Sequence, residues 1–380
     1  MKFKGTRFSA TLLLLVALVI SALAGMDFMG MWADDSFVPA PGFEKKMLSQ
    51  WHSGLAGTPA DTPVYIQSGE ETGGTVLILG GTHPTEPASL MTSVLFLERA
   101  HVTKGRLIVI TQANLLGFTH NSPQEAHPQS ISFTTADGGT RTFRFGSRLT
   151  NPIYEWPAPD IYIHPASGQQ LPGKERGNLN RCYPGVPDGS ITEQVAYALT
   201  ELVRGENVDL AFDLHEASPE YPVVNAIVAH ERSMELAAMT VMDLEAAGIA
   251  MRLEPSPTNL RGLTHREWGN YTETMPILME TGNPVQGRLR GRTDERLAIT
   301  GEDKAYMKAA PLGRLYIPYD GDQRMEYRVG RHTAAIMSFL DNLEMAYEEQ
   351  GVLVENIPTF EEIQEKGVGF FLAPLKKSGL

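Results

Sequence analysis

The chain has 380 residues, 42% of them hydrophobic, which is sufficient for one large α/β domain and a smaller additional part. Its formal net charge is -13, and a polyanion repels phosphate backbones, so we expect no nucleic acid partner. The chain has one cysteine, Cys182, which excludes an intrachain disulfide, and we expect it to be a small buried hydrophobic residue.

The N-terminus has the composition of a targeting segment. Basic residues precede an apolar run over 10-24, and Ala22-Leu23-Ala24 has the small-x-small form of a cleavage site. The apolar run is short for a full membrane span. We therefore expect a signal peptide or membrane anchor over 1-24 and an exported protein, periplasmic or extracellular. Attachment to the membrane through residues 10-26 is the alternative to cleavage.

The first half of the chain contains two clear strand patterns. Residues 25-72 contain several prolines and are expected to be irregular. The apolar run 75-79 predicts a buried strand, and a helix is predicted to begin at Glu86, because a following proline fits the first helical turn. A second strand is predicted at 106-111. The pattern is then lost over about 118-177, which predicts a functional loop or an insertion.

The pattern returns at Ser190, which forms an S/T-x-x-E capping box with Glu193 and predicts a helix to about Arg204. The remaining predicted elements are strands at 210-214, 223-228 and 275-279, and helices at about 232-247 and 327-349. Alternating strands and helices predict an α/β fold with a mixed, mostly parallel sheet flanked by helices.

The predicted layout is a catalytic domain over 25-295, which contains the 118-177 insertion, and a C-terminal segment over 296-380 that packs on it. Ligands of such sheets bind at the carboxyl ends of the strands. The polar residues His83, His215 and Glu280 lie at or just past such ends. The sequence therefore predicts one functional site at this edge of the sheet.

A candidate metal site consists of His83, Glu86 and His215. The first two are three residues apart, so on a turn that enters a helix they can point the same way, and the third comes from another strand. Two imidazoles and one carboxylate, with a fourth position open for water, are a common ligand set of catalytic zinc. We predict one Zn²⁺ per chain. The alternative is a loop histidine beside a surface glutamate.

Two further carboxylates belong to this edge. Glu280 ends an apolar strand, where burying a carboxylate costs free energy and is therefore expected only if the group has a partner or a catalytic role. It is predicted to take a proton from a zinc-bound water and to return one to the leaving amine, and the alternative is a salt bridge. Asp213 shares a strand face with His215 and is predicted to orient that ligand.

Asn180-Arg181 and Arg176 are candidates for substrate contacts. A guanidinium fork suits a substrate carboxylate, which Asn180 and Arg181 are predicted to bind. Arg176 is predicted to polarise the scissile carbonyl or to stabilise its oxyanion. Considered singly, each of these residues also fits a solvated loop.

Together these motifs resemble the zinc-carboxypeptidase superfamily and, within it, the succinylglutamate desuccinylase/aspartoacylase family. The resemblance covers about residues 73-300 and rests on Gly81-x-His83-x-x-Glu86, Asn180-Arg181, Asp213-Leu214-His215 and the run from Glu280 to Gly287. It implies that the three predicted ligands hold zinc, that Glu280 is the general base and acid, and that Asn180 and Arg181 bind a carboxylate.

The chain departs from the family pattern at three places. Asn178 stands where the family has an aspartate; it can still accept a bond from a zinc-bound histidine, but without a negative charge. The family arginine upstream of the Asn-Arg pair corresponds to Arg176 or Lys174. A further specificity arginine precedes the base in the family, and His265 and Arg266 are the candidates here.

These observations predict a zinc-dependent hydrolase that cleaves an amide bond of an N-acyl amino acid or a related small molecule with a carboxylate. One alternative is an exported zinc carboxypeptidase that acts on peptides or cell-wall peptides. The other is a non-catalytic metal-binding module, against which the presence of Glu280 beside the ligand set argues.

Overall fold

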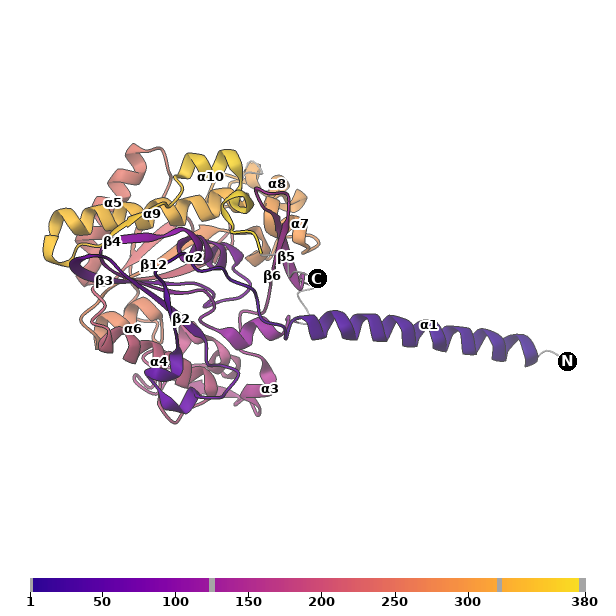
Figure 1. Ribbon diagram of the computed structural model, residues 1–380. Helices are drawn as coiled ribbons and strands as arrows, with labels where there is room; N and C mark the ends of the chain where they lie inside the picture. The colour runs from indigo at the N-terminus through magenta and orange to yellow at the C-terminus, as the bar shows by residue number, and fades with distance from the viewer. Residues whose placement is uncertain (1–2, 123–126, 320–322, 376–380) are drawn as a thin grey trace.

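The structure is a computed structural model that describes residues 3–122, 127–319 and 323–375. Its centre is a nine-stranded sheet. The four central strands run parallel, in the spatial order β4 (His101–Ile110), β3 (Glu71–Leu79), β9 (Leu210–Ala217) and β12 (Met275–Gly282). The predicted α/β fold with a mixed sheet and flanking helices is thereby confirmed (Figure 1).

The outer strands make the sheet mixed. They are β1 (Glu44–Met47), β2 (Pro63–Ser68), β10 (Ala226–Ala229), β11 (Arg252–Pro255) and β13 (Leu353–Glu355). β2 pairs antiparallel with β4, and β10 pairs antiparallel with β12 and parallel with β11. The expectation of irregular structure over 25-72 is wrong, because β1 and β2 lie there. Proline is compatible with β2 because Pro63 is its first residue, where a missing N–H is tolerated.

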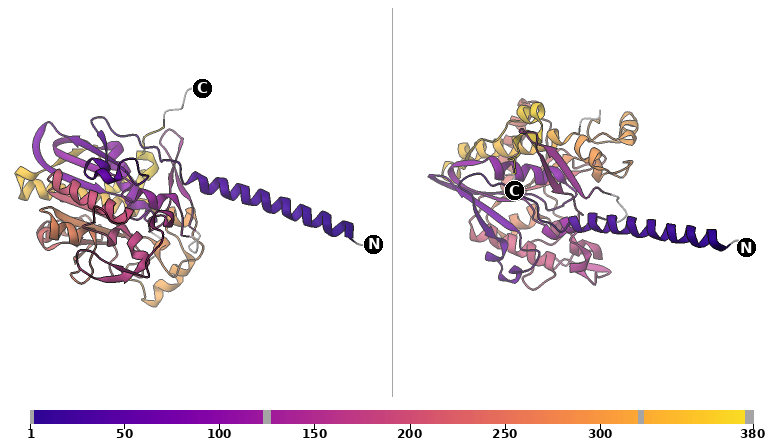
Figure 2. Two further views of the ribbon diagram at one scale, coloured as in Figure 1. Left: turned by 90° about the horizontal axis from the view of Figure 1, so that it is seen from below. Right: turned by 45° about the vertical axis from the view of Figure 1, so that its right-hand side comes forward.

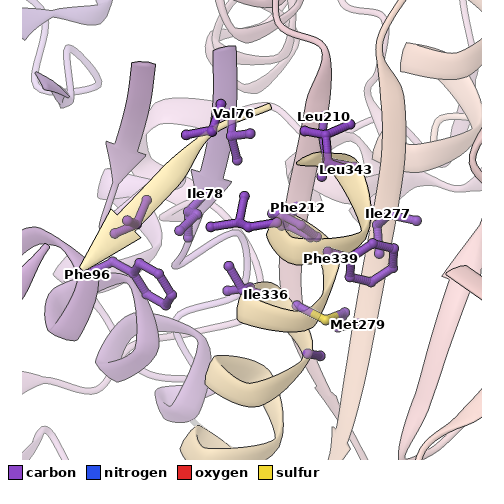
Figure 3. Packing of buried hydrophobic residues seen from close by; sticks show 14 of the residues in the cluster. Val76, Ile78, Phe96, Leu210, Phe212, Ile277, Met279, Ile336, Phe339 and Leu343 are labelled. Atoms are coloured by element: carbon purple, nitrogen blue, oxygen red, sulfur yellow. The ribbon is translucent and has the colours of Figure 1, made fainter. Parts of the chain in front are cut away.

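Three helices cover one face of the sheet: α2 (Pro87–Arg99), α5 (Met234–Ala246) and α9 (Met325–Ala346). Figure 3 shows Phe339 of α9 beside Phe212 of β9, and the two rings lie 5.2 Å apart between centroids. Alternate residues of each central strand enter this core, since successive side chains of a strand point to opposite faces.

The opposite face carries α4 (Ile191–Gly205) and α6 (Thr264–Tyr271). The capping box predicted at Ser190 and Glu193 is present, with both reciprocal bonds formed. Trp268 of α6 is fully buried beneath this face, against Tyr183. The two faces of the central strands are therefore both buried, which explains their near-continuous hydrophobic sequences.

The region 118-177 contains more regular structure than its sequence indicates. Its elements are β5 (Ser130–Thr134), β6 (Thr140–Arg144), α3 (Pro152–Glu155), β7 (Ile161–Ile163) and β8 (Gln170–Pro172). β5 pairs with β6 and β7 with β8, as two small antiparallel sheets apart from the main one.

The C-terminal segment is part of the layered structure. It contains α7 (Glu295–Thr300), α8 (Lys304–Ala309), α9, β13 and α10 (Phe360–Lys366). α9 packs on α2 and α5, and β13 joins the main sheet beside β4.

The N-terminal helix α1 (Phe3–Gly30) projects away from the body of the molecule in all views (Figures 1 and 2). Residues Thr6–Gly30 are long and apolar enough to cross a membrane, and this stretch is not buried in the protein. Two residues that follow α1, Met31 and Asp35, are instead fixed by hydrogen bonds to the body of the protein, and we call them the root of α1. The Arg144 guanidinium donates to the Met31 carbonyl (3.1 Å) and to the Asp35 carboxylate (3.0 Å). Asp35 also accepts from Gln112, so the root lies just past the carboxyl end of β4.

Candidate metal centre and active site

The turn after β3 carries two of the candidate ligands. Gly81 has a φ of +67°, and a Cβ there would lie 2.7 Å from the Thr111 carbonyl oxygen, so only glycine fits this reversal. His83 follows in the turn, and Glu86 is the N-cap residue of α2. Both side chains are thereby fixed at the carboxyl end of β3.

β9, the parallel neighbour of β3, supplies the third candidate ligand, His215. Asp213, two residues earlier, lies on the same strand face. Its carboxylate accepts hydrogen bonds from the hydroxyls of Thr82 (2.7 Å) and Thr264 (2.5 Å). These bonds fix the carboxylate next to the imidazole that it faces.

The three candidate ligands converge. Nδ1 of His83 lies 2.9 Å from Oε1 of Glu86, and Nδ1 of His215 lies 2.9 Å from Oε2 of the same carboxylate. The two Nδ1 atoms are 3.1 Å apart. Ligand atoms about 2.1 Å from a tetrahedral ion are roughly 3.3 Å from one another, so this spacing fits zinc. All three side chains are buried, and their donor atoms lie within 4.8 Å of one another.

The outer nitrogens of both imidazoles face oxygen acceptors. Nε2 of His83 lies 2.9 Å from Oδ1 of Asn178, and Nε2 of His215 lies 2.9 Å from Oδ2 of Asp213. A proton on each Nε2 leaves the Nδ1 lone pairs free for a metal, and metal-binding histidines usually have such a partner. The donor chemistry and the orientation of the rings therefore both fit a divalent cation.

The electrostatics of the three side chains are strongly coupled. Burial opposes the charge on Glu86, but the two neighbouring imidazoles outweigh it and lower the pKa of this carboxyl. Burial, aided by the positive charge of Arg148, lowers the pKa of His83 to about 4. For His215, burial is outweighed by the carboxylates of Asp213 and Glu86, which raise its pKa well above the usual value. A proton on His215 therefore competes with metal binding, and release of that proton accompanies loading of the metal.

Glu280 lies beside this cluster because β12 pairs in parallel with β9 and places Glu280 directly opposite His215. Its Oε2 atom is buried and has no hydrogen-bond partner among the described residues. Burial raises the pKa of Glu280 to about 8, although the charge of His215 opposes this. A carboxyl with a raised pKa, beside a candidate metal site, has the properties of a general base or acid.

A cavity of about 510 Å³ opens over these groups, a volume suitable for a small molecule. One end of it is lined by His83, His215 and Glu280. Other polar residues that line it are Arg148, Asn180, Arg181, Glu216, Ser218, Tyr221, Glu254, Asn259, His265 and Gln286.

Asn180 and Arg181 both line the cavity, as the prediction of a carboxylate-binding pair requires. The backbone N–H of Thr264 donates to Oδ1 of Asn180 at 2.9 Å, which leaves the Nδ2 group for a ligand. Arg181 donates to its neighbour's carbonyl and lies 3.9 Å from Glu175, so its charge is only weakly compensated.

The structure does not bring Arg176 to the cavity. Its guanidinium pairs with the Glu155 carboxylate at 3.0 Å and donates to the Pro157 carbonyl at 2.9 Å, away from the residues that line the site. Arg148 lies there instead, with Nη1 3.1 Å from Oε1 of Glu86. It follows β6, within the region 118-177, and no sequence motif marks it.

The two candidates for a specificity residue before Glu280 have different surroundings. His265 is buried and lines the cavity, whereas Arg266, on the next position of α6, pairs with Glu231 at 2.8 Å. His265 is thus the one of the two that can meet a substrate. Cys182 is buried, as its sequence environment indicates.

A buried ion pair next to the candidate ligands stabilises them, and its residues were not predicted from the sequence. Glu216 and Arg328 pair at 2.7 Å, and both side chains are fully buried. The Glu216 backbone N–H donates to Oε2 of Glu86 (3.0 Å), and its carboxylate accepts from the N–H of Ala88 in the first turn of α2 (3.0 Å). Arg328 belongs to α9, so the C-terminal segment stabilises the site. The only signal in the sequence is a second carboxylate directly after His215.

Replacing Arg328 with methionine is expected to lower the free energy of unfolding by about 3–5 kcal/mol, because it leaves the buried Glu216 carboxylate without its cationic partner. Urea denaturation of the zinc-free protein measures this. The double variant Glu216→Gln with Arg328→Met should recover part of the loss, and Arg99→Met, at the exposed end of α2, is the control. Equal stability of wild type and Arg328→Met would contradict the role of the pair.

No protein family model and no curated protein matches this chain. Among solved structures, it is similar to the product-bound ectoine utilization protein EutE (DoeB) from Ruegeria pomeroyi, with 21% identity and a TM-score of 0.38; the match covers 60% of this chain and 55% of that one. It is similar to a succinylglutamate desuccinylase/aspartoacylase from Rhodobacter sphaeroides, with 16% identity, coverage of 86% and 70%, and a TM-score of 0.42. It is also similar to the tripeptide-bound cell shape determinant Csd4 from Helicobacter pylori, with 12% identity, coverage of 81% and 60%, and a TM-score of 0.47.

The chain thus spans just over half the length of the EutE structure that it matches. Structures named for the succinylglutamate desuccinylase/aspartoacylase family, which the sequence motifs resemble, are among those similar to this chain. Identities this low transfer neither a substrate nor an activity.

Proposed function

We propose that the protein is a zinc-dependent hydrolase that cleaves an amide bond in an N-acyl amino acid or a related small molecule with a carboxylate. One observation carries this proposal: the His83, Glu86 and His215 donor atoms converge within 4.8 Å of one another, and Glu280 stands opposite His215 in the adjacent strand. Three protein ligands leave a position open for water, which is the arrangement of catalytic rather than structural zinc.

Zinc held by His83, Glu86 and His215 would lower the pKa of a bound water to about 7 and polarise the substrate carbonyl. Glu280 accepts the proton of the attacking water as a carboxylate and then, as an acid, delivers it to the nitrogen of the leaving amine. The charge of an adjacent cation favours the carboxylate form of Glu280, which offsets the effect of its burial.

The arginines position the substrate. Arg181, together with the free Nδ2 group of Asn180, binds the substrate carboxylate in a bidentate manner. Arg148, which reaches the cavity beside Glu86, donates to the carbonyl oxygen as it gains negative charge during attack. Asn178 and Asp213 keep the two imidazoles oriented.

We expect Arg148→Met to lower kcat/KM by about 10²-fold, mainly through kcat, because a donor to the developing oxyanion is lost. Arg176→Met is the matched control and should change kcat/KM by less than about threefold, since its guanidinium is bound to Glu155 outside the cavity. Steady-state kinetics of the two variants show which of the two arginines contacts the oxyanion. A larger loss for Arg176→Met would assign the oxyanion contact to that residue instead.

A substrate panel tests the function directly. Zinc content is measured first, followed by hydrolysis of N-acetyl and N-succinyl amino acids and of peptides with free C-termini. Hydrolysis of acyl amino acids alone supports the proposal, and release of C-terminal residues from peptides supports the carboxypeptidase alternative. Bound zinc without any turnover would identify a non-catalytic metal-binding module.

We propose further that the protein is exported and remains anchored by α1. The apolar helix Thr6–Gly30 has 25 residues and is about 37 Å long, enough to cross a bilayer and longer than the apolar part of a typical signal peptide. Near the root of α1, the ring centroids of Trp32 and Tyr154 are 6.4 Å apart. The side chain of Trp156, two residues after Tyr154, is 82% exposed. Exposed tryptophan and tyrosine rings are favoured at the level of lipid headgroups.

The anchored form should stay with membranes after alkaline carbonate extraction, and its intact mass should include residues 1-24. A variant that lacks residues 2-30 should be recovered in the soluble fraction with its zinc content unchanged. A mature chain that begins at about residue 25 would instead establish a cleaved signal peptide.

A further inference from the structure

The end of the cavity distant from the candidate metal ligands carries a carboxylate, Glu254 of β11. Glu254 is in register with Val228 of β10, and Val228 with Leu278 of β12, two residues before Glu280. These four side chains lie on one face of the sheet and line the cavity. The intervening residues, Leu253 among them, pack into the opposite core. The direction of Glu254 is therefore set by the pleat of β11.

The cavity crosses the strands in the order β9, β12, β10 and β11. β11 is two strand spacings from β12, which is about 10 Å, and Glu254 lies two residues back from the level of Glu280, which is about 7 Å along the strands. The two Cα atoms are therefore roughly 12 Å apart. A substrate side chain of four carbons that ends in a cation can reach the Glu254 carboxylate across this distance when it starts at the carbon next to the scissile amide.

The strip of sheet between the two ends is apolar, because Val228 and Leu278 lie between Glu254 and Glu280. The cavity is also lined by the apolar residues Leu263, Pro255 and Pro257 and by the polar residues Ser218, Tyr221 and Asn259. A hydrocarbon chain of the substrate would replace water along this strip, and a charged group would be unfavourable there.

Glu254 forms no ion pair within the part of the chain that the structure describes. Among the described residues that line the cavity, the only arginines are Arg148 and Arg181, which lie at the end with the candidate metal ligands, beside Glu86 and Asn180, and there is no lysine. His265 also lines the cavity, but burial lowers its pKa to about 3, so it is neutral at pH 7. A half-buried carboxylate at the end of a cavity is stabilised when a ligand supplies the positive charge.

We propose that the cavity binds amide substrates whose carboxylate-bearing residue has an aliphatic side chain that ends in an ammonium or guanidinium group, with Nα-acyl-lysine as the simplest example. This inference rests on the proposed function, because it assigns the two ends of one substrate to Arg181 and Glu254. It adds a selection by charge that the metal ligands and Glu280 cannot provide.

The first test compares kcat/KM for Nα-acetyl-lysine and Nα-acetyl-norleucine, which have side chains of similar length and differ in the ammonium group. The wild type should prefer the lysine substrate by about tenfold or more. Glu254→Gln should remove that preference, mainly by lowering kcat/KM for the lysine substrate, and Glu254→Lys should favour Nα-acetyl-glutamate. The control, Glu245→Gln, changes an exposed carboxylate on α5, and should retain the wild-type preference.

The second test does not require turnover. Binding of free lysine and free norleucine to the zinc-loaded protein is measured by calorimetry for the wild type and Glu254→Gln. Tighter binding of lysine, lost in the variant, supports the inference even if none of the acyl substrates is cleaved, in which case the proposed reaction alone fails. Equal affinities for both amino acids, or a lysine preference that persists in Glu254→Gln, would overturn it.

Discussion

Replacement of Glu280 with glutamine is expected to lower kcat by about 10³-fold or more while the protein still binds one zinc ion. Glutamine has nearly the same shape but cannot accept the proton of the attacking water or return it to the leaving amine. The measurement is steady-state hydrolysis of the best substrate, together with metal analysis of the same sample. Glu273→Gln is the control, because Glu273 lies just before β12 and its side chain is 98% exposed. Turnover close to that of the wild type would exclude Glu280 as the base.

The same variant should be more stable than the wild type in the absence of metal. Burial raises the pKa of Glu280 to about 8 in the folded protein, against an ordinary value of 4.5. Below about pH 4.5 both the folded and the unfolded chain carry the proton, and this group has no effect. As the pH rises towards 8 the unfolded chain loses the proton first, so the wild type loses stability, while Glu280→Gln does not. Urea denaturation at pH 8.5 should show the variant more stable by roughly 4 kcal/mol.

The second large effect concerns the metal. His215→Ala should reduce zinc content from one ion per chain to nearly none and abolish hydrolysis, because the remaining two ligands cannot complete the site. Zinc at 1,000 times its dissociation constant should stabilise the wild type by about 4 kcal/mol, seen as a higher melting temperature, and should leave the variant unchanged. His101→Ala, at an exposed position of β4, is the control. Full activity after exhaustive chelation would exclude a metal mechanism for any choice of ligands.

The sequence predicted those parts of the fold that have a strong local pattern. β3, β9 and β12 each contain an apolar run that is buried on both faces, and α4 begins at a capping box. The strands β1 and β2 were not predicted, because short strands between prolines acquire their stability from pairing with β4 rather than from their own sequence.

The residues of the candidate site likewise include some that the sequence predicts and some that it does not. Four of them lie at or just past the carboxyl ends of strands that meet at one edge, so the proximity of His83, Glu86, His215 and Glu280 can be inferred from the order of strands alone. Arg148 cannot be found by this reasoning, since it enters the cavity from an irregular segment after β6. The sequence also does not reveal that Glu155 binds the guanidinium of Arg176, and so the choice between two arginines depends on tertiary contacts.

The firm root of α1 has a consequence for where the protein can work. Met31 is only 1% exposed and Asp35 is bound to Arg144, so ordered contacts join the apolar helix to the carboxyl edge of the sheet. If α1 is anchored in a bilayer, as we propose, these contacts hold the domain at the lipid surface and keep it from diffusing through the wider compartment. Encounters then depend on compounds that arrive at that surface or diffuse laterally along it, and a compound fixed far from the bilayer is out of reach.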